Sequence, residues 1–230
     1  GRLLGVGYAG FFADREIGLM RLWPDGNLDS GGQQTLAMGT PTFPPGSDEY
    51  AYGMAVQPDG RILVAGTAVT ASNTESDCVL SRFLPNGLLD GTFGTSGRAA
   101  IGIHNLDVAR GLALQADGKI IVAGYTGAPN TQFFLARFNG NGSLDTSFGL
   151  AGMNTLDFFG GADYARAVGL APDGKIYVAG SVTNGLNLVF GVARFNANGI
   201  IDTSFDGDGK QIHTFSGMTG LGADALLVQP

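Results

Sequence analysis

A seven-residue phrase recurs along the chain at nearly constant spacing, and it constrains the fold more than any other feature. Each copy begins with Gly and a basic residue, continues with two large apolar residues, and ends on Gly. The copies start 59, 58 and 56 residues apart. Repetition at such a period indicates an array of supersecondary units, each burying its apolar face against its neighbours. The copies are GRLLGVG (1–7), GRILVAG (60–66), GKIIVAG (118–124) and GKIYVAG (174–180).

Two further phrases extend each copy into a longer unit. An apolar segment ending in Asp precedes three copies, and DALLVQP at 224–230 repeats most of it. A second phrase contains Arg, then Asp-Gly or Asn-Gly, then Asp; its copies occupy 20–30, 81–91, 136–146 and 193–203. Asp-Gly and Asn-Gly supply the positive φ that tight hairpins need. Each unit is therefore predicted to hold four short strands, a to d, with constant a–b and c–d turns and variable b–c and d–a connections.

Four antiparallel strands in a repeat of about 57 residues predict an all-β propeller with one blade per repeat. Strand b is apolar on both faces, as in IIVAG at 120–124, which suits a blade covered on both sides. A β-solenoid or an open stack of blades is the alternative. The expected blades are 1–57, with its inner strand supplied by 224–230, then 51–106, 107–162 and 163–223.

Composition excludes several classes of protein. The 39 glycines suit many turns between short strands. A net charge of −7 with 13 Lys and Arg argues against a nucleic-acid partner. No apolar run approaches the ~18 residues of a membrane span, and Cys78 as the only cysteine excludes an internal disulfide. No nucleophile-elbow motif is present, so we expect no catalytic activity.

The first half of each repeat reads A-[LV]-Q-x-D-G-[KR]-I-x-V-A-G and the second half A-R-F-N-x-[ND]-G-x-[LI]-D-T-S-F-G. This pattern resembles the bacterial delta-60 repeat family over essentially the whole chain, most closely in three of the four repeats. The resemblance implies a propeller-like fold in a large secreted or cell-surface bacterial protein without a general catalytic activity. We therefore expect an extracellular or cell-surface location.

The first strand is of type b and the last of type a, which leaves two interpretations open. If the ring closes, 224–230 becomes the inner strand beside 2–7, and one mixed blade removes two open sheet edges. Alternatively, the chain is a piece of a longer array whose open edges pair with further blades or with a second copy.

An Arg in strand c lies eight residues before an Asp in every repeat. A charge between blades needs a partner, and the c–d hairpin returns the Asp toward the Arg. We therefore predict a structural ion pair in each repeat; a substrate-carboxylate clamp is the functional alternative, but one site would not need four copies. The pairs are Arg21–Asp29, Arg82–Asp90, Arg137–Asp145 and Arg194–Asp202.

The turn at 200–210 is the most acidic, with Asp202, Asp206 and Asp208 within seven residues. Alternating carboxylates with glycines for the bend suit Ca²⁺. The distal bidentate Glu of an EF-hand is missing, so an ordinary polar turn is the favoured interpretation, and we expect no obligatory cofactor.

The b–c and d–a connections differ in every repeat, and in a propeller both emerge on one face, which is therefore free to specialise. Its aromatic residues could stack on sugars or anchor a protein, or they could pack the loops down. These residues are Tyr8, Phe11, Phe12, Phe43 and Tyr125.

We favour a non-enzymatic binding or scaffold module that presents this loop face to a protein or glycan. One alternative is a propeller hydrolase or lyase acting on polysaccharide. Another is a structural subunit that self-associates through its open blade edges.

Overall fold

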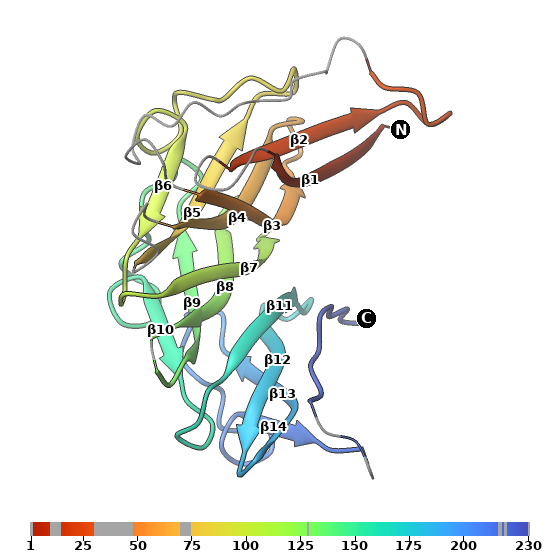
Figure 1. The fold of residues 1–230 in the computed structure, drawn as a ribbon. Helices are drawn as coiled ribbons and strands as arrows, with labels where there is room; N and C mark the ends of the chain where they lie inside the picture. The colour runs from red at the N-terminus through yellow and green to blue at the C-terminus, as the bar shows by residue number, and fades with distance from the viewer. Residues whose placement is uncertain are drawn as a thin grey trace. The chain divides into compact units, whose positions relative to one another are not determined.

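The computed structural model describes residues 2–9, 15–29, 48–69, 75–127, 129–215, 218 and 220–229. Phe11, Phe12 and Phe43 lie outside the described residues. The regular structure of the described part is entirely β, and no helix there could cross a membrane (Figure 1). The strands are β1 (Leu3–Ala9), β2 (Glu16–Leu22), β3 (Asp48–Val56), β4 (Ile62–Val69), β5 (Ser76–Phe83), β6 (Arg98–Ile101), β7 (Asp107–Leu114), β8 (Ile120–Thr126), β9 (Gln132–Phe138), β10 (Met153–Leu156), β11 (Tyr164–Leu170), β12 (Ile176–Asn184), β13 (Asn187–Phe195) and β14 (Lys210–His213).

The second, third and fourth repeats each form one four-stranded antiparallel sheet. Their strands a to d are β3–β6, β7–β10 and β11–β14, and each strand pairs with the next one along the chain. The first repeat contributes β1 and β2, which form a two-stranded sheet in the described residues. The predicted all-β fold built from antiparallel blades is therefore confirmed.

The chain divides into two compact units, Gly1–Val108 and Ala109–Pro230. In unit 1, the core includes Ile17, Val64 and Phe83; in unit 2, it includes Leu135 and Phe148. β4 buries every residue from Ile62 to Ala68, as expected for a strand that is covered on both faces.

The a–b turns have the predicted Asp-Gly geometry. The side chains of Asp59, Asp117 and Asp173 each accept a hydrogen bond from the backbone N–H two residues later, at 3.0, 3.1 and 3.0 Å. The glycine after each Asp has a φ of 83° or 84°, a conformation that other residues rarely adopt. These aspartates therefore shape their own turns.

A glycine in strand b allows the inner strand to come close. A Cβ on Gly66 or Gly180 would overlap the carbonyl oxygen of Tyr50 or Tyr164, at the point where the register of the inner strand shifts. Gly7 holds the same repeat position in β1, but a Cβ there would meet none of the described residues within 4 Å. This close-approach position is thus filled in the second and fourth repeats and open in the first.

The C-terminal copy of strand a, predicted over 224–230, does not form a strand in its described residues. Residues 221–229, which we call the tail, instead lie against β11 (Figure 1). A Cβ on Gly169 would lie 3.0 Å from Val228, much as one on Gly111 of β7 would lie 2.9 Å from the backbone of Val168 in β11. The tail thus follows β11 as β11 follows β7, but it forms no ladder, because both b strands of unit 2 already pair with their own inner strands.

Candidate functional site

The structure brings each predicted Arg together with the Asp eight residues later. The Arg Nε lies 2.7–2.8 Å from the Asp Oδ2 in all four repeats. The same Asp donates its backbone N–H to the Arg carbonyl at 2.8–3.0 Å, so the c–d hairpin itself fixes the pair. Every one of these aspartates is buried. The pairs are Arg21–Asp29, Arg82–Asp90, Arg137–Asp145 and Arg194–Asp202.

A second cation, which was not predicted from the sequence, binds each of these carboxylates. It is the basic residue that begins strand b, at 2.8–3.1 Å from the Asp Oδ2. This basic residue directly follows a Gly in every repeat, and that constant position could have revealed its role. A hydrogen bond from Lys119, helped by one from Ser147, holds the pKa of Asp145 well below its usual range. The second cations are Arg2, Arg61, Lys119 and Lys175.

We call each Arg–Asp pair with its second cation an ion cluster. In the last three repeats, two further groups complete this cluster. A hydroxyl two residues after the Asp donates to its Oδ1 at 2.6–2.7 Å; the donors are Thr92, Ser147 and Ser204. The guanidinium lies 4.5–4.8 Å from a ring centroid; the rings are Phe93, Phe148 and Phe205. Because both carboxylate oxygens are engaged by donors, this arrangement suits a structural brace rather than a proton-transfer site.

The ion cluster also joins consecutive repeats. In unit 2, Arg137 Nη1 donates to the carbonyl of Ala197 at 2.8 Å, and the Gly149 N–H donates to the carbonyl of Asn198 at 2.7 Å. A Cβ on Gly199 would lie 2.6 Å from the ring of Phe148. The c–d turn of the fourth repeat therefore sits on the cluster of the third. In unit 1, Arg21 donates in the same way to the carbonyl of Pro85.

The acidic turn does not gather its carboxylates into a metal-binding group. Asp202 faces Lys175 and Arg194, and the Oδ1 of Asp208 accepts the backbone N–H of Lys210 at 2.9 Å. Asp206 has a φ of 51° and continues the turn. Among the described residues, no three His, Cys, Asp or Glu side chains are placed to hold one metal ion.

Tyr8 and Tyr125 hold the same position near the end of strand b, and each contacts a tyrosine of the next inner strand. The Tyr8 and Tyr50 rings meet edge to face at a centroid distance of 5.2 Å, and the Tyr125 and Tyr164 rings do so at 5.0 Å. We call these groups the tyrosine–arginine clusters, because a guanidinium accompanies each pair.

In unit 1, the guanidinium of Arg15 lies 5.5 Å from the ring centroids of both Tyr8 and Tyr50, and Tyr52 stacks on Tyr50 at 6.3 Å. In unit 2, Arg110 lies 5.9 Å from the ring centroid of Tyr125. Tyr8 is 57% exposed. Tyr50 and Tyr164 were not among the predicted residues, although the two share one repeat position.

A comparison with family profiles supports this architecture. The profile described as "Domain of unknown function (DUF5122) beta-propeller" matches residues 1–31, 57–93, 115–148 and 171–205, more than half of the chain. The chain belongs to this family. Each matched segment of the DUF5122 beta-propeller contains one complete Arg–Asp pair together with its second cation. A comparison with curated proteins gives no match.

Three buried acids form a second recurring set in this DUF5122 beta-propeller. Glu49, Asp107 and Asp163 each lie ten residues before the Asp of an a–b turn, a spacing that could have revealed them. Asp163 accepts backbone N–H groups of Phe158 and Thr183 at 2.8 and 3.1 Å. Burial raises the pKa of Asp163 and of Glu49.

Glu49 lies in β3 and pairs with buried Arg98 at 3.1 Å. Asp107 accepts the backbone N–H of Ile103 at 2.6 Å. Asp107 and Asp163 hold the d–a connections in place, and Glu49 joins β3 to β6, so we assign all three a structural role.

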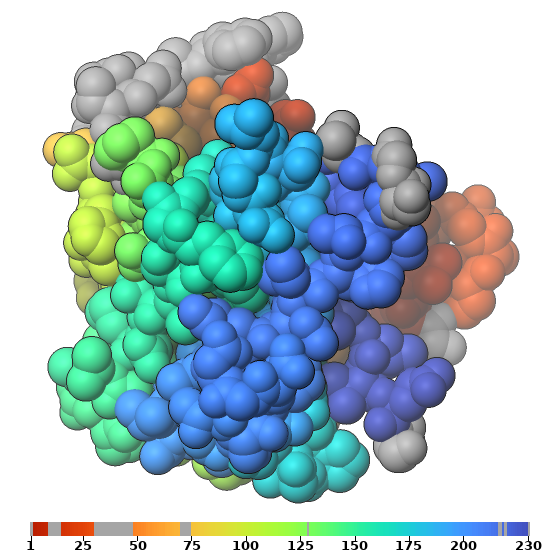
Figure 2. Space-filling view, turned by 90° about the horizontal axis from the view of Figure 1, so that it is seen from below, coloured from red at the N-terminus to blue at the C-terminus, as the bar shows by residue number. Residues whose placement is uncertain are grey.

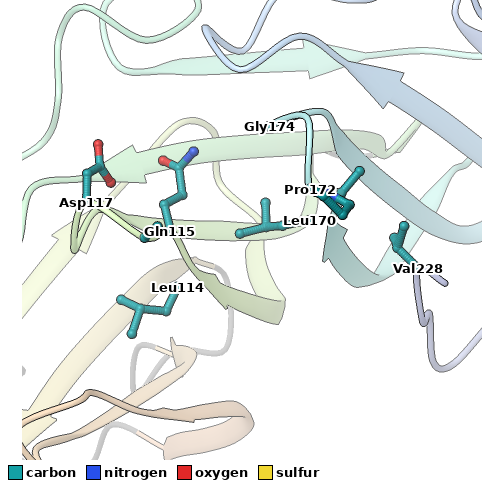
Figure 3. A pocket seen from close by; sticks show the side chains of 9 residues that line it. Leu114, Gln115, Asp117, Leu170, Pro172, Gly174 and Val228 are labelled. Atoms are coloured by element: carbon teal, nitrogen blue, oxygen red, sulfur yellow. The ribbon is translucent and has the colours of Figure 1, made fainter. Parts of the chain in front are cut away.

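A cavity of about 550 Å³ lies at the a–b turns of unit 2 (Figure 3). Its apolar wall includes Leu114, Leu170 and Val228, which hold one repeat position in β7, β11 and the tail. The Oε1 of Gln115 on the same wall is buried without a hydrogen bond. The volume is that of a small-molecule pocket, but the cavity lies at the constant turns, away from the variable connections.

Proposed function

We propose that this beta-propeller is a non-catalytic binding module of a secreted or cell-surface bacterial protein. Its ligand is a glycan or a protein that docks on the b–c and d–a end of the blades. The observation that supports this proposal most directly is the tyrosine–arginine cluster, which recurs in both units at that end. The proposed location rests on the resemblance to delta-60 repeats.

The chemistry of the clusters favours a glycan. Exposed aromatic faces stack on sugar rings, and tyrosine hydroxyls and guanidinium groups hydrogen-bond sugar hydroxyls. Tyr8 and Tyr52 are 57% and 37% exposed, so ring surface remains for a ligand. We propose that binding needs no cofactor, and chelation of divalent cations should leave it unchanged.

Retention on insoluble cellulose, xylan, chitin and peptidoglycan tests this proposal. We expect at least one to bind the wild type, and Tyr8→Ala with Tyr125→Ala to weaken that binding by about tenfold or more. Trp23→Ala is the matched control: this ring is 40% exposed, lies under Arg2, and follows β2 at the opposite end of its sheet. No retention refutes the glycan ligand, and equal retention of all variants refutes the assigned face.

A further inference from the structure

Five aromatic rings follow one another along the b–c and d–a end of unit 2. Tyr125 in β8 lies directly opposite Phe133 in β9, so the two share one face of the sheet. The Phe133 ring meets the Phe158 ring at a centroid distance of 5.1 Å, and Phe158 meets Phe159 at 6.2 Å. On the other side, Tyr125 contacts Tyr164. We call these five residues the aromatic row; they belong to the third and fourth repeats, both of which have four described strands.

The aromatic row reaches the surface at its two ends. Phe133 and Phe158 in its middle are buried, with 1% and 5% of their surface exposed. Tyr125 and Tyr164 at one end are half-buried, and Phe159 at the other end is 55% exposed. The middle of the row therefore packs the blade, and its ends are available to a ligand.

The connection 157–163, between β10 and β11, fixes the backbone around the exposed Phe159 ring. Both carboxylate oxygens of Asp157 accept the Gly160 N–H, at 3.0 and 2.9 Å. The Phe158 N–H donates to the Oδ2 of buried Asp163 at 2.8 Å. A ligand that stacks on Phe159 thus orders one ring and not a whole loop, which lowers the entropic cost of binding.

Polar side chains lie beside both ends of the aromatic row. The guanidinium of Arg110 lies 5.9 Å from the ring centroid of Tyr125. Next to Phe159, the Nδ2 of exposed Asn130 donates to the carbonyl of Gly160 at 3.1 Å. A sugar presents an apolar ring face bordered by hydroxyls, so it can stack on an aromatic ring while amide and guanidinium groups bind its hydroxyls. Both ends of the row therefore suit a sugar.

We propose that the aromatic row binds an oligosaccharide chain, with one sugar stacked on Tyr125 and another on Phe159. This inference rests on the glycan-binding function proposed above and names the class of glycan. Tyr125 lies in strand b and Phe159 follows strand d, so two strand spacings, ~10 Å, separate the two positions. A monosaccharide cannot reach both rings, whereas a chain of several sugars can.

A neighbouring apolar side chain distinguishes a sugar chain from a protein partner. Leu186 is fully exposed at the tip of the β12–β13 hairpin. This hairpin lies against the connection 157–163, because the Thr183 N–H donates to the Oδ1 of Asp163 at 3.1 Å (Figure 2, light blue and teal). A protein would bury Leu186 together with Phe159, but a sugar needs an aromatic face, which Leu lacks. Leu186→Ala is therefore the matched control.

Isothermal titration calorimetry with the full chain tests the proposal. The probes are tetrasaccharide fragments and the constituent monosaccharides of cellulose, xylan, chitin and the peptidoglycan glycan strand. For the polysaccharide that retains the protein, we expect the tetrasaccharide to bind at least about tenfold more tightly than the monosaccharide, and Phe159→Ala to weaken tetrasaccharide binding by about tenfold. Phe159→Tyr, which keeps a ring, and Leu186→Ala should both bind like the wild type.

The outcomes separate this inference from the proposed function. If Tyr125→Ala weakens retention on a polysaccharide but Phe159→Ala does not, the aromatic row is overturned and the proposed function stands. Equal affinities for the tetrasaccharide and the monosaccharide overturn the row as well. So do equal losses in Leu186→Ala and Phe159→Ala, because they indicate a general apolar contact and not stacking. Retention on no polysaccharide refutes the proposed glycan ligand, and this inference with it.

Discussion

Replacing Arg137 with alanine tests whether the ion cluster braces the fold. The side chain is 10% exposed and makes three contacts: Asp145 at 2.7 Å, the Ala197 carbonyl at 2.8 Å, and the Phe148 ring at 4.5 Å. The substitution removes all three at once. It leaves Asp145 buried with Lys119 as its remaining cation.

The expected loss in the free energy of unfolding is about 3 kcal/mol. Removing one partner of a buried pair costs about 3–5 kcal/mol, mostly because the other charge is left uncompensated. Lys119 at 2.8 Å still compensates Asp145, which places the loss at the lower end. The lost hydrogen bond to Ala197 adds about 1 kcal/mol, and the cation–π contact adds about 0.5 kcal/mol, within that total.

Arg194→Ala is the matched comparison. Arg194 makes the same ion pair at 2.8 Å, and its side chain is 20% exposed. At protein concentrations that keep every variant monomeric, its loss should be smaller than that of Arg137→Ala. Urea unfolding followed by circular dichroism measures both midpoints. Equal midpoints for the two variants would show that the bond to the next turn contributes nothing, and a wild-type midpoint for Arg137→Ala would refute the brace.

Two further predictions concern backbone packing and charge. Gly180→Ala should lower the melting temperature, because its Cβ would overlap the Tyr164 carbonyl oxygen, at a cost of about 1–3 kcal/mol; Gly5→Ala, whose Cβ meets only Met20 Cε at 3.4 Å, should have a smaller effect. The pKa of Asp145 is lowered in the fold, so its contribution to stability is present above the unfolded pKa of about 3.9 and is lost as the pH falls through the folded pKa. The urea midpoint of Asp145→Asn should therefore fall less between pH 5 and pH 2 than that of the wild type.

The blades were predictable from the sequence because their signals are local. Asp59 and Gly60 form their turn through hydrogen bonds between residues close in sequence, so the same short sequence forms the same turn wherever it occurs. The Arg–Asp pairs were predictable for a similar reason, since one hairpin joins the two residues.

The missed features depend on contacts between distant residues. Lys119 reaches Asp145 across 26 positions, so its role follows only once strands b and c are set in register. Glu49 is an acidic residue that is buried in β3, and its burial depends on Arg98, which lies 49 positions away. The tail has the sequence of an inner strand, but pairing into a sheet also needs a neighbouring strand with an unpaired edge.

The two ends of the blades differ in how constant their residues are from repeat to repeat. At the c–d end, the Arg–Asp pair and its second cation occur in all four repeats, which fits a contact that must form wherever one repeat follows another. At the b–c end, the position of Tyr8 and Tyr125 holds Thr67 in the second repeat and Ser181 in the fourth, both buried. The fold thus accepts a small polar residue where the other repeats carry tyrosine. A large, partly exposed ring that the fold does not require is available to the ligand that we propose, whereas the recurring ion pairs brace the c–d end.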